Sequence, residues 1–255
     1  MRLFDRFPAK YLAPNAITCT GIVLGLLSIR TSLSAHELGP LVGSAWLILY
    51  AVLLDKTDGA VARRLGASSE FGVQLDSFSD FVTFGLAPAA LLTQALSVAA
   101  PGFADGPAHA ALLAVGALYA VAAAVRLAKF NVTTASIGKD FFLGLPSTSS
   151  GGLLAAGFLA HRANDLPVAT LPLFAGALAL NAALMLCNLP MPKIQAPAVA
   201  WRRVGMGALL VSAYVLIPIR RGATYLVTLA SVATVGGFIY GLAVTRGRPP
   251  ASADH

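Results

Sequence analysis

Eight apolar segments of the amino-acid sequence are long enough, or nearly long enough, to cross a lipid bilayer as helices. A transmembrane helix needs about 20 mainly apolar residues, and the loops between these segments are short and contain Gly, Pro, His or charged residues. Only 11% of all residues are charged, against roughly 25% in soluble domains. We therefore predict an all-α fold, a polytopic bundle of transmembrane helices. The segments cover approximately residues 15–34, 41–62, 75–97, 109–130, 145–160, 167–187, 204–219 and 223–245.

The fifth and seventh segments are short, so six or seven spans are alternatives to eight. Residues 1–245 are expected to form one integral-membrane domain, and residues 246–255 a short, disordered cytoplasmic tail. No small-residue cleavage site follows the first apolar run, which we interpret as a retained helix. Cys19 and Cys187 lie in apolar segments, and their spacing indicates neither a disulfide framework nor a metal-thiolate site.

The basic residues predict which side of the membrane each loop faces, because cytoplasmic loops are enriched in Lys and Arg. A cytoplasmic N-terminus places most of the 18 basic residues on the cytoplasmic side, whereas Arg162 and the pair Arg220–Arg221 fall on the other side. We therefore expect both termini in the cytoplasm, in a multi-pass protein of the cell (inner, cytoplasmic) membrane. The net charge of +7 suits a surface next to anionic headgroups. The dispersed basic residues argue against nucleic-acid binding.

Four aspartates lie at spacings of three and four in otherwise apolar surroundings. Asp55 and Asp58 share a helix face near the end of the second span, and Asp76 and Asp80 share one at the start of the third. Ionisable groups at membrane depth are energetically costly and normally mark a function. A short connection would bring the two pairs together, and converging carboxylates repel one another unless cations bind them. Their oxygen atoms suit Mg²⁺, Mn²⁺ or Ca²⁺ better than Zn²⁺.

Small residues accompany the four aspartates. Gly59, Ala62 and Gly72 leave room for a substrate to approach the helix backbone, although close helix packing is an alternative interpretation. Arg63 can hold a phosphate through two hydrogen bonds, or it can anchor the helix end at the cytoplasmic face. A cation-coupled transporter is the competing class of protein. It would place acidic residues at mid-depth in two related halves, whereas these acids cluster near one interface and the halves do not match.

Written out, the spacing is Asp55-x2-Asp58-Gly59-x2-Ala62-Arg63-x8-Gly72-x3-Asp76-x3-Asp80. This pattern resembles the signature of the CDP-alcohol phosphotransferase (phosphatidyltransferase) family. The flanking stretches PNAITCTGIVLGLLSI, RLAKFN at 126–131 and FFLGLPSTSSGG at 141–152 resemble the membrane-embedded phosphatidylserine synthases within it. The resemblance covers roughly residues 10–160. It implies a six-helix catalytic core with about two further helices, a homodimer, and transfer of a phosphate-linked group from a CDP-activated donor to an alcohol.

The resemblance also implies roles for individual residues. By motif position, Asp55, Asp58 and Asp76 would bind a metal ion at the CDP diphosphate, and Asp76 and Asp80 a second ion. Mg²⁺ or Mn²⁺ is expected, with Ca²⁺ as an alternative, and Asp80 would be the general base for the acceptor hydroxyl. The positions assigned to the nucleotide and its diphosphate are Gly59, Ala62, Arg63, Gly72, Asn15 and Thr18, with helix capping as the alternative role of Asn15.

The expected acceptor is L-serine, and the products are phosphatidylserine and CMP. A serine carboxylate calls for a cationic pocket. Arg126 and Lys129, at i, i+3 near the end of the fourth span, are the leading candidates, followed by Lys139; snorkelling is an alternative role for Lys129. The GLPSTSSGG segment either lines the acceptor site or begins the fifth helix. Glycerol phosphate, inositol phosphate and choline are alternative acceptors, although the two phosphates should need more cationic residues than are present here.

Overall fold

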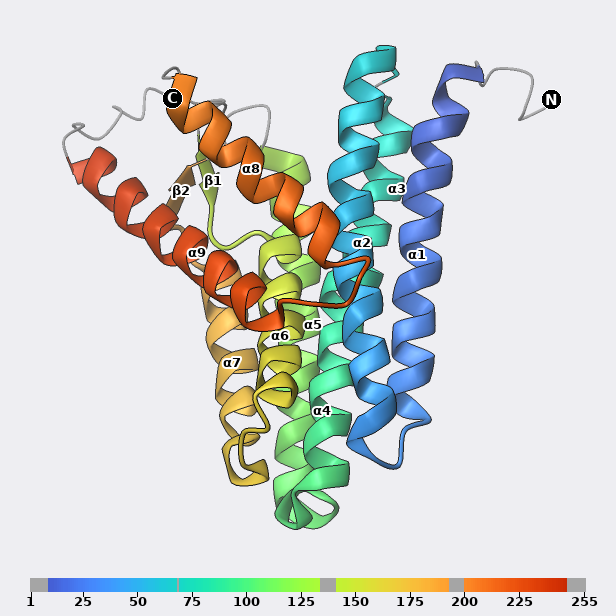
Figure 1. Ribbon diagram of the computed structural model, residues 1–255, viewed down its shortest axis with the longest axis vertical. Helices are drawn as coiled ribbons and strands as arrows, with labels where there is room; N and C mark the ends of the chain where they lie inside the picture. The colour runs from blue at the N-terminus through green and yellow to red at the C-terminus, as the bar shows by residue number, and fades with distance from the viewer. Residues whose placement is uncertain (1–8, 68, 134–140, 193–199, 247–255) are drawn as a thin grey trace.

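The computed structural model describes residues 9–67, 69–133, 141–192 and 200–246. Within these ranges the chain is almost entirely helical, so the predicted all-α fold class is confirmed (Figure 1). The helices are α1 (Leu12–Leu33), α2 (Leu38–Leu65), α3 (Glu70–Asp80), α4 (Ala87–Ala99), α5 (Gly106–Thr133), α6 (Ser147–Ala163), α7 (Leu173–Leu186), α8 (Ala200–Leu216) and α9 (Ala223–Arg246). Short 3₁₀ turns cover Ala9–Tyr11, Pro101–Phe103 and Val168–Thr170, and a two-stranded pair is formed by β1 (Phe141–Leu143) and β2 (Pro190–Pro192).

Six helical stretches of the described residues are long and apolar enough to cross a membrane. They are Leu12–Leu33, Leu38–Leu65, Glu70–Ala99, Gly106–Val132, Val168–Leu186 and Ala223–Ala243. The chain is therefore a multi-pass membrane protein. Helices α6 and α8, which correspond to the two segments predicted to be short, have 17 residues each.

The third span is one continuous helical rod with a change of pitch in its middle. Helix α3 ends at Asp80, a π-helical turn covers Phe81–Leu86, and α4 continues from Ala87. Wide turns of this kind leave backbone carbonyls free for other partners and occur frequently at functional sites. Here the buried Tyr119 of α5 donates a hydrogen bond to the carbonyl oxygen of Phe84 (2.8 Å). The turn directly follows Asp80. The hydrogen bond from Tyr119 therefore connects the helix that carries Asp80 to α5 in the bundle core.

Helix α1 packs closely against this rod through two glycines. A Cβ atom at Gly21 would lie 2.8 Å from Ser79 Oγ, and one at Gly25 would lie 2.6 Å from Thr83 Oγ1. The close approach allows Ser79 and Thr83 to donate hydrogen bonds to the carbonyl oxygens of Thr18 and Gly21 (3.2 and 3.1 Å). Small residues that admit interhelical hydrogen bonds stabilise helix pairs in membranes. This contact fixes α1 beside the acidic end of the third span.

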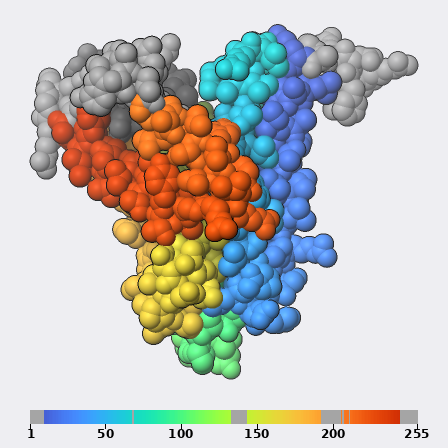
Figure 2. Space-filling view, in the orientation of Figure 1, coloured from blue at the N-terminus to red at the C-terminus, as the bar shows by residue number. Residues whose placement is uncertain are grey.

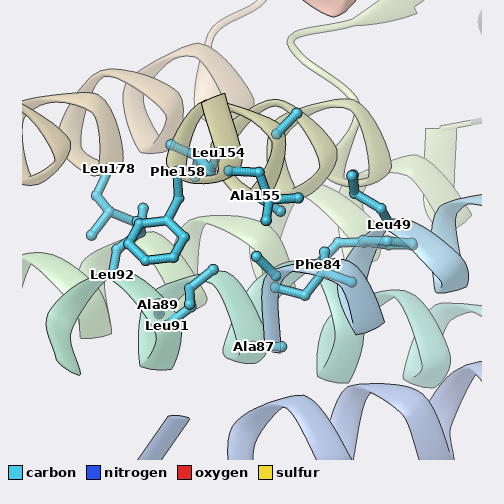
Figure 3. Packing of buried hydrophobic residues seen from close by; sticks show 14 of the residues in the cluster. Leu49, Phe84, Ala87, Ala89, Leu91, Leu92, Leu154, Ala155, Phe158 and Leu178 are labelled. Carbon is cyan, nitrogen blue, oxygen red and sulfur yellow. The ribbon is translucent and has the colours of Figure 1, made fainter. Parts of the chain in front are cut away.

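The centre of the bundle is an apolar core to which five of the spans contribute (Figure 3). Phe158 of α6 lies beside Leu92 of the third span and Leu178 of α7, and Phe84 of the third span lies beside Leu49 of α2. A hydrogen-bonded group joins the same elements: Tyr119 Oη lies 3.1 Å from Ser150 Oγ, which donates to Asn181 Oδ1 (2.9 Å). The core therefore holds α5, α6 and α7 in a defined arrangement around the third span.

Helices α8 and α9 form a hairpin that lies obliquely across one face of the bundle (Figures 1 and 2). Tyr214 of α8 donates a hydrogen bond to the carbonyl oxygen of Leu53 (3.1 Å). In the turn of the hairpin, Arg220 Nε donates to the hydroxyl of Tyr50 (3.0 Å), and its guanidinium lies over that ring. Tyr50 is near the middle of α2, so the turn lies beside the middle of that helix. This differs from the expectation that Arg220 and Arg221 reach the opposite face.

Candidate active site

Two helices bring three carboxylates together. Asp55 comes from the C-terminal half of α2, whereas Asp76 and Asp80 lie one turn apart on α3. One oxygen of each side chain can be chosen so that all three lie within 4.8 Å of one another. Asp80 is buried, and Asp55 and Asp76 are half-buried. The convergence that the sequence spacing predicts is therefore present for these three residues, which we call the carboxylate group.

Asp58 is placed differently. Its Oδ2 accepts a hydrogen bond from Thr18 Oγ1 of α1 (2.7 Å), and its Oδ1 accepts one from the backbone N–H of Gly59 (2.6 Å). Its side chain is buried and lies outside the carboxylate group as defined above. It lines a small cavity together with Asp55 and Asp76, so it remains a neighbour of the group.

The carboxylate group suits a hard divalent cation. Mg²⁺, Mn²⁺ and Ca²⁺ bind oxygen ligands at roughly 2.0–2.6 Å, so two ligands of one ion lie up to about 4–5 Å apart. The separations among Asp55, Asp76 and Asp80 are of this size. The three ligand residues offer only oxygen atoms, which favours these ions over zinc. The donor set and its spacing therefore fit the metal that the family signature implies.

A larger hollow lies beside the carboxylate group, between α1, the end of α2 and the start of α3. It is partly open and has a volume of about 150 Å³, below the roughly 300–1,000 Å³ of typical small-molecule pockets. The residues that line it are Pro14, Asn15, Thr18, Asp58, Gly59, Ala62, Ala67, Ser69, Gly72, Val73 and Asp76. Five of the six residues that the motif assigns to the nucleotide are among them. We call this hollow the α1–α3 cavity.

The first turn of α3 opens toward the α1–α3 cavity. Ser69 caps the helix, and its Oγ accepts a hydrogen bond from the N–H of Gly72 (3.0 Å). Helix N-termini carry partial positive charge and bind phosphate groups. The remaining predicted nucleotide contact, Arg63, is exposed on α2, and its Nη1 lies close to Gly59, 3.3 Å from where a Cβ would be. Arg63 is therefore near the cavity without lining it.

Asp80 is connected to a buried arginine through one serine. Ser147 Oγ, at the first position of α6, donates a hydrogen bond to Asp80 Oδ2 (3.2 Å) and accepts one from Arg126 Nη1 (3.0 Å). All three side chains are buried, and the guanidinium of Arg126 also lies over the ring of Phe130. The hydroxyl of Ser147 therefore bridges Arg126, the predicted acceptor contact, and Asp80, the predicted general base. Sequence reasoning flagged the segment that contains Ser147 but not the residue itself.

The other predicted acceptor contacts are less closely tied to Asp80. Lys129 donates a hydrogen bond from Nζ to Asn188 Oδ1, beyond the end of α7. Lys139 lies outside the described residues, as do residues 247–255 of the tail predicted at 246–255, whereas Arg246 is the last residue of α9. Gly144, in the loop before α6, has a positive φ of 72°, and a Cβ there would lie 2.7 Å from the carbonyl oxygen of Met185. Glycine lets this loop pack against α7 and present Ser147 to Asp80.

Lys56 is a further charged residue at the site that sequence reasoning did not assign. Its Nζ forms an ion pair with Asp55 Oδ2 at 2.8 Å. The side chain of Asp55 is 16% exposed and that of Lys56 is 59% exposed. The pair therefore lies at the exposed edge of the carboxylate group.

The chain is similar in sequence to known proteins. The model of the CDP-alcohol phosphatidyltransferase family matches residues 11–236. A protein of Helicobacter pylori strain J99 named CDP-diacylglycerol–serine O-phosphatidyltransferase is 33% identical over 186 residues, 72% of this chain and 73% of that protein. Proteins of the same name are 34% identical over 142 residues in Methanocaldococcus jannaschii (56% of this chain, 57% of that protein) and 37% identical over 139 residues in Bacillus subtilis (54% and 70%).

Proposed function

Because this chain belongs to the CDP-alcohol phosphatidyltransferase family, we propose that it transfers the phosphatidyl group of CDP-diacylglycerol to the hydroxyl of L-serine. In this reaction the serine oxygen forms a bond to the lipid-side phosphorus and the bond from that phosphorus to CMP breaks. The products are phosphatidylserine and CMP, and the hydroxyl proton is released. The observation that carries the proposal is the carboxylate group of Asp55, Asp76 and Asp80 beside the α1–α3 cavity.

Divalent cations assist the family in general, and Asp55, Asp76 and Asp80 would hold Mg²⁺ or Mn²⁺ here. When bound, such an ion neutralises phosphate charge and helps to align the reacting groups. Asp58 would add a ligand after losing its contact with Thr18, or it would remain a support for α1. A second ion would share Asp76 and Asp80.

Asp80 is the candidate general base. A serine hydroxyl is a weak nucleophile at neutral pH, so a carboxylate within hydrogen-bonding reach is needed to accept its proton. Ser147 donates to one Asp80 oxygen, which leaves the other oxygen to face the acceptor. Arg126 supplies positive charge behind Ser147 and is the best-placed described side chain for the carboxylate of the amino acid.

The nucleotide would occupy the α1–α3 cavity. Gly59, Ala62 and Gly72 leave the backbone accessible there, and the first turn of α3 offers N–H groups to the diphosphate. Asn15 and Thr18 line the side formed by α1, and Arg63 would reach the phosphates from the rim. Positioning of this kind accounts for much of the rate acceleration in phosphoryl-type transfer.

The setting of the reaction is also part of the proposal. The start of α1, the junction of α2 and α3, and the end of α9 lie at one end of the bundle (Figure 1). We assign this end to the cytoplasm of a cell whose inner membrane holds the protein, because it carries Arg63 and Arg64 and cytoplasmic loops are rich in such residues. A homodimer is proposed as the working form.

The choice of serine draws support from the printed names of the relatives. To test it, purified protein is mixed with CDP-diacylglycerol and Mn²⁺ or Mg²⁺, and CMP release is measured with serine, glycerol phosphate, inositol phosphate or choline. Metal-dependent release with serine is expected. If CMP is released only with another alcohol, that alcohol replaces serine as the acceptor and the proposed reaction class stands. If CMP is released with none of them, the proposed reaction is rejected.

A further inference from the structure

We propose that Lys56 is an internal counter-ion of the carboxylate group, which stabilises the three acids when no divalent cation is bound and competes with that cation for Asp55. The metal-binding role of Asp55, Asp76 and Asp80 on which this rests is part of the proposed function.

Lys56 contacts Asp55 although the two residues are adjacent in helix α2. Residues adjacent in a helix project about 100° apart, so i, i+1 side chains do not face each other. Lys56 nevertheless bends back toward its neighbour, and its Nζ lies 2.8 Å from Asp55 Oδ2. The ammonium group thus lies on the side of α2 where Asp55 meets Asp76 and Asp80.

The three carboxylates of the site need nearby positive charge. Three carboxylates within 4.8 Å repel one another strongly in partly buried surroundings. The hydroxyl of Ser147 lies between Arg126 and Asp80, whereas Lys56 contacts a carboxylate oxygen of Asp55 directly. A lysine is suited to a temporary contact, since its charge sits on a flexible four-carbon chain.

Lys56 and a metal ion would compete because both would bind the Asp55 carboxylate. A metal ion bound by the Asp55 carboxylate would lie close to the Lys56 ammonium on that same carboxylate, and the ammonium and the ion repel each other. The Lys56 side chain is 59% exposed, so it has room to turn away from Asp55 when the ion arrives. The contact therefore weakens metal binding by the free energy needed to break it.

The test compares Lys56→Gln with Arg64→Gln, which removes one positive charge from an exposed position farther along the same helix. Mn²⁺ binding is measured by titration calorimetry on the full-length protein in detergent, without substrates. Thermal unfolding is measured in excess chelator. We expect Lys56→Gln to tighten Mn²⁺ binding by about tenfold, a typical coupling between two linked charges, and to lower the melting temperature in chelator. Arg64→Gln should change neither, and Lys56→Arg should resemble the wild type in chelator.

Equal Mn²⁺ affinity and equal melting temperature in the two glutamine variants would overturn the proposal. Weaker Mn²⁺ binding in Lys56→Gln would overturn it as well, because Lys56 would then support the ion. Both results are distinct from a failure of the proposed function, in which the wild type releases no CMP with any alcohol. If the wild type binds no Mn²⁺, the melting temperatures in chelator still decide whether Lys56 stabilises the acids.

Discussion

Replacing Ser147 by alanine removes the hydroxyl that joins Asp80 to Arg126 while leaving both charged groups in place. The variant loses the hydrogen bond from Ser147 Oγ to Asp80 Oδ2 and leaves Arg126 Nη1 without its acceptor. Hydrogen bonds to charged groups contribute roughly 1.5–3 kcal/mol. If this amount is lost in the transition state, kcat falls by roughly 10- to 150-fold at about 1.4 kcal/mol per factor of ten.

The assay is metal-dependent CMP release, with kcat and KM determined for serine at saturating CDP-diacylglycerol and for CDP-diacylglycerol at saturating serine. The loss should appear in kcat, with the KM for CDP-diacylglycerol unchanged, because the α1–α3 cavity does not include Ser147. Ser147→Thr keeps the hydroxyl and should restore most of the activity.

Ser150→Ala is the matched control. Ser150 lies on the same helix and is equally buried, but it donates to Asn181 within the core rather than to Asp80. Equal losses of kcat in the two alanine variants, or no rescue by threonine, would refute a positioning role for Ser147.

Three further predictions concern the base, the metal and the helix packing. Asp80→Asn should abolish transfer while CDP-diacylglycerol binding, measured by titration calorimetry, largely survives; full activity would exclude Asp80 as the general base. Removal of divalent ions with EDTA should stop CMP release, and added Mn²⁺ should restore it; activity that persists in EDTA would contradict a metal role for the carboxylate group. Gly25→Val should destabilise the fold by roughly 1–3 kcal/mol through overpacking, because a Cβ at Gly25 would lie 2.6 Å from Thr83 Oγ1. Its thermal unfolding in detergent should show a lower melting temperature than the wild type, and an unchanged value would argue against close packing of α1 on the third span.

Most helices of this fold could be predicted from hydropathy because they lie in apolar runs. The short fifth and seventh segments became α6 and α8, at 17 residues each. Hydropathy could not reveal the oblique course of α8 and α9, however. That course depends on contacts of Tyr214 and Arg220 with α2, more than 150 residues earlier in the chain.

Local spacing predicted that Asp55, Asp76 and Asp80 converge, since each lies on a helix face that short connections bring together. The position of Asp58 could not be predicted in this way, because it depends on Thr18 of α1 competing for its carboxylate. Ser147 was missed for a similar reason. A serine acquires this role only when α6 begins beside both Asp80 and Arg126, which are 67 and 21 residues away in the chain.

The central claim is that the hydroxyl of serine becomes bonded to the phosphatidyl group at this site. The most direct measurement incubates the purified protein with CDP-diacylglycerol, Mn²⁺ and isotopically labelled serine, and identifies the lipid product by mass spectrometry. We expect labelled phosphatidylserine in amounts equal to the CMP released, with no labelled lipid from Asp80→Asn. CMP release without labelled lipid, or labelled lipid from Asp80→Asn at the wild-type rate, would contradict it.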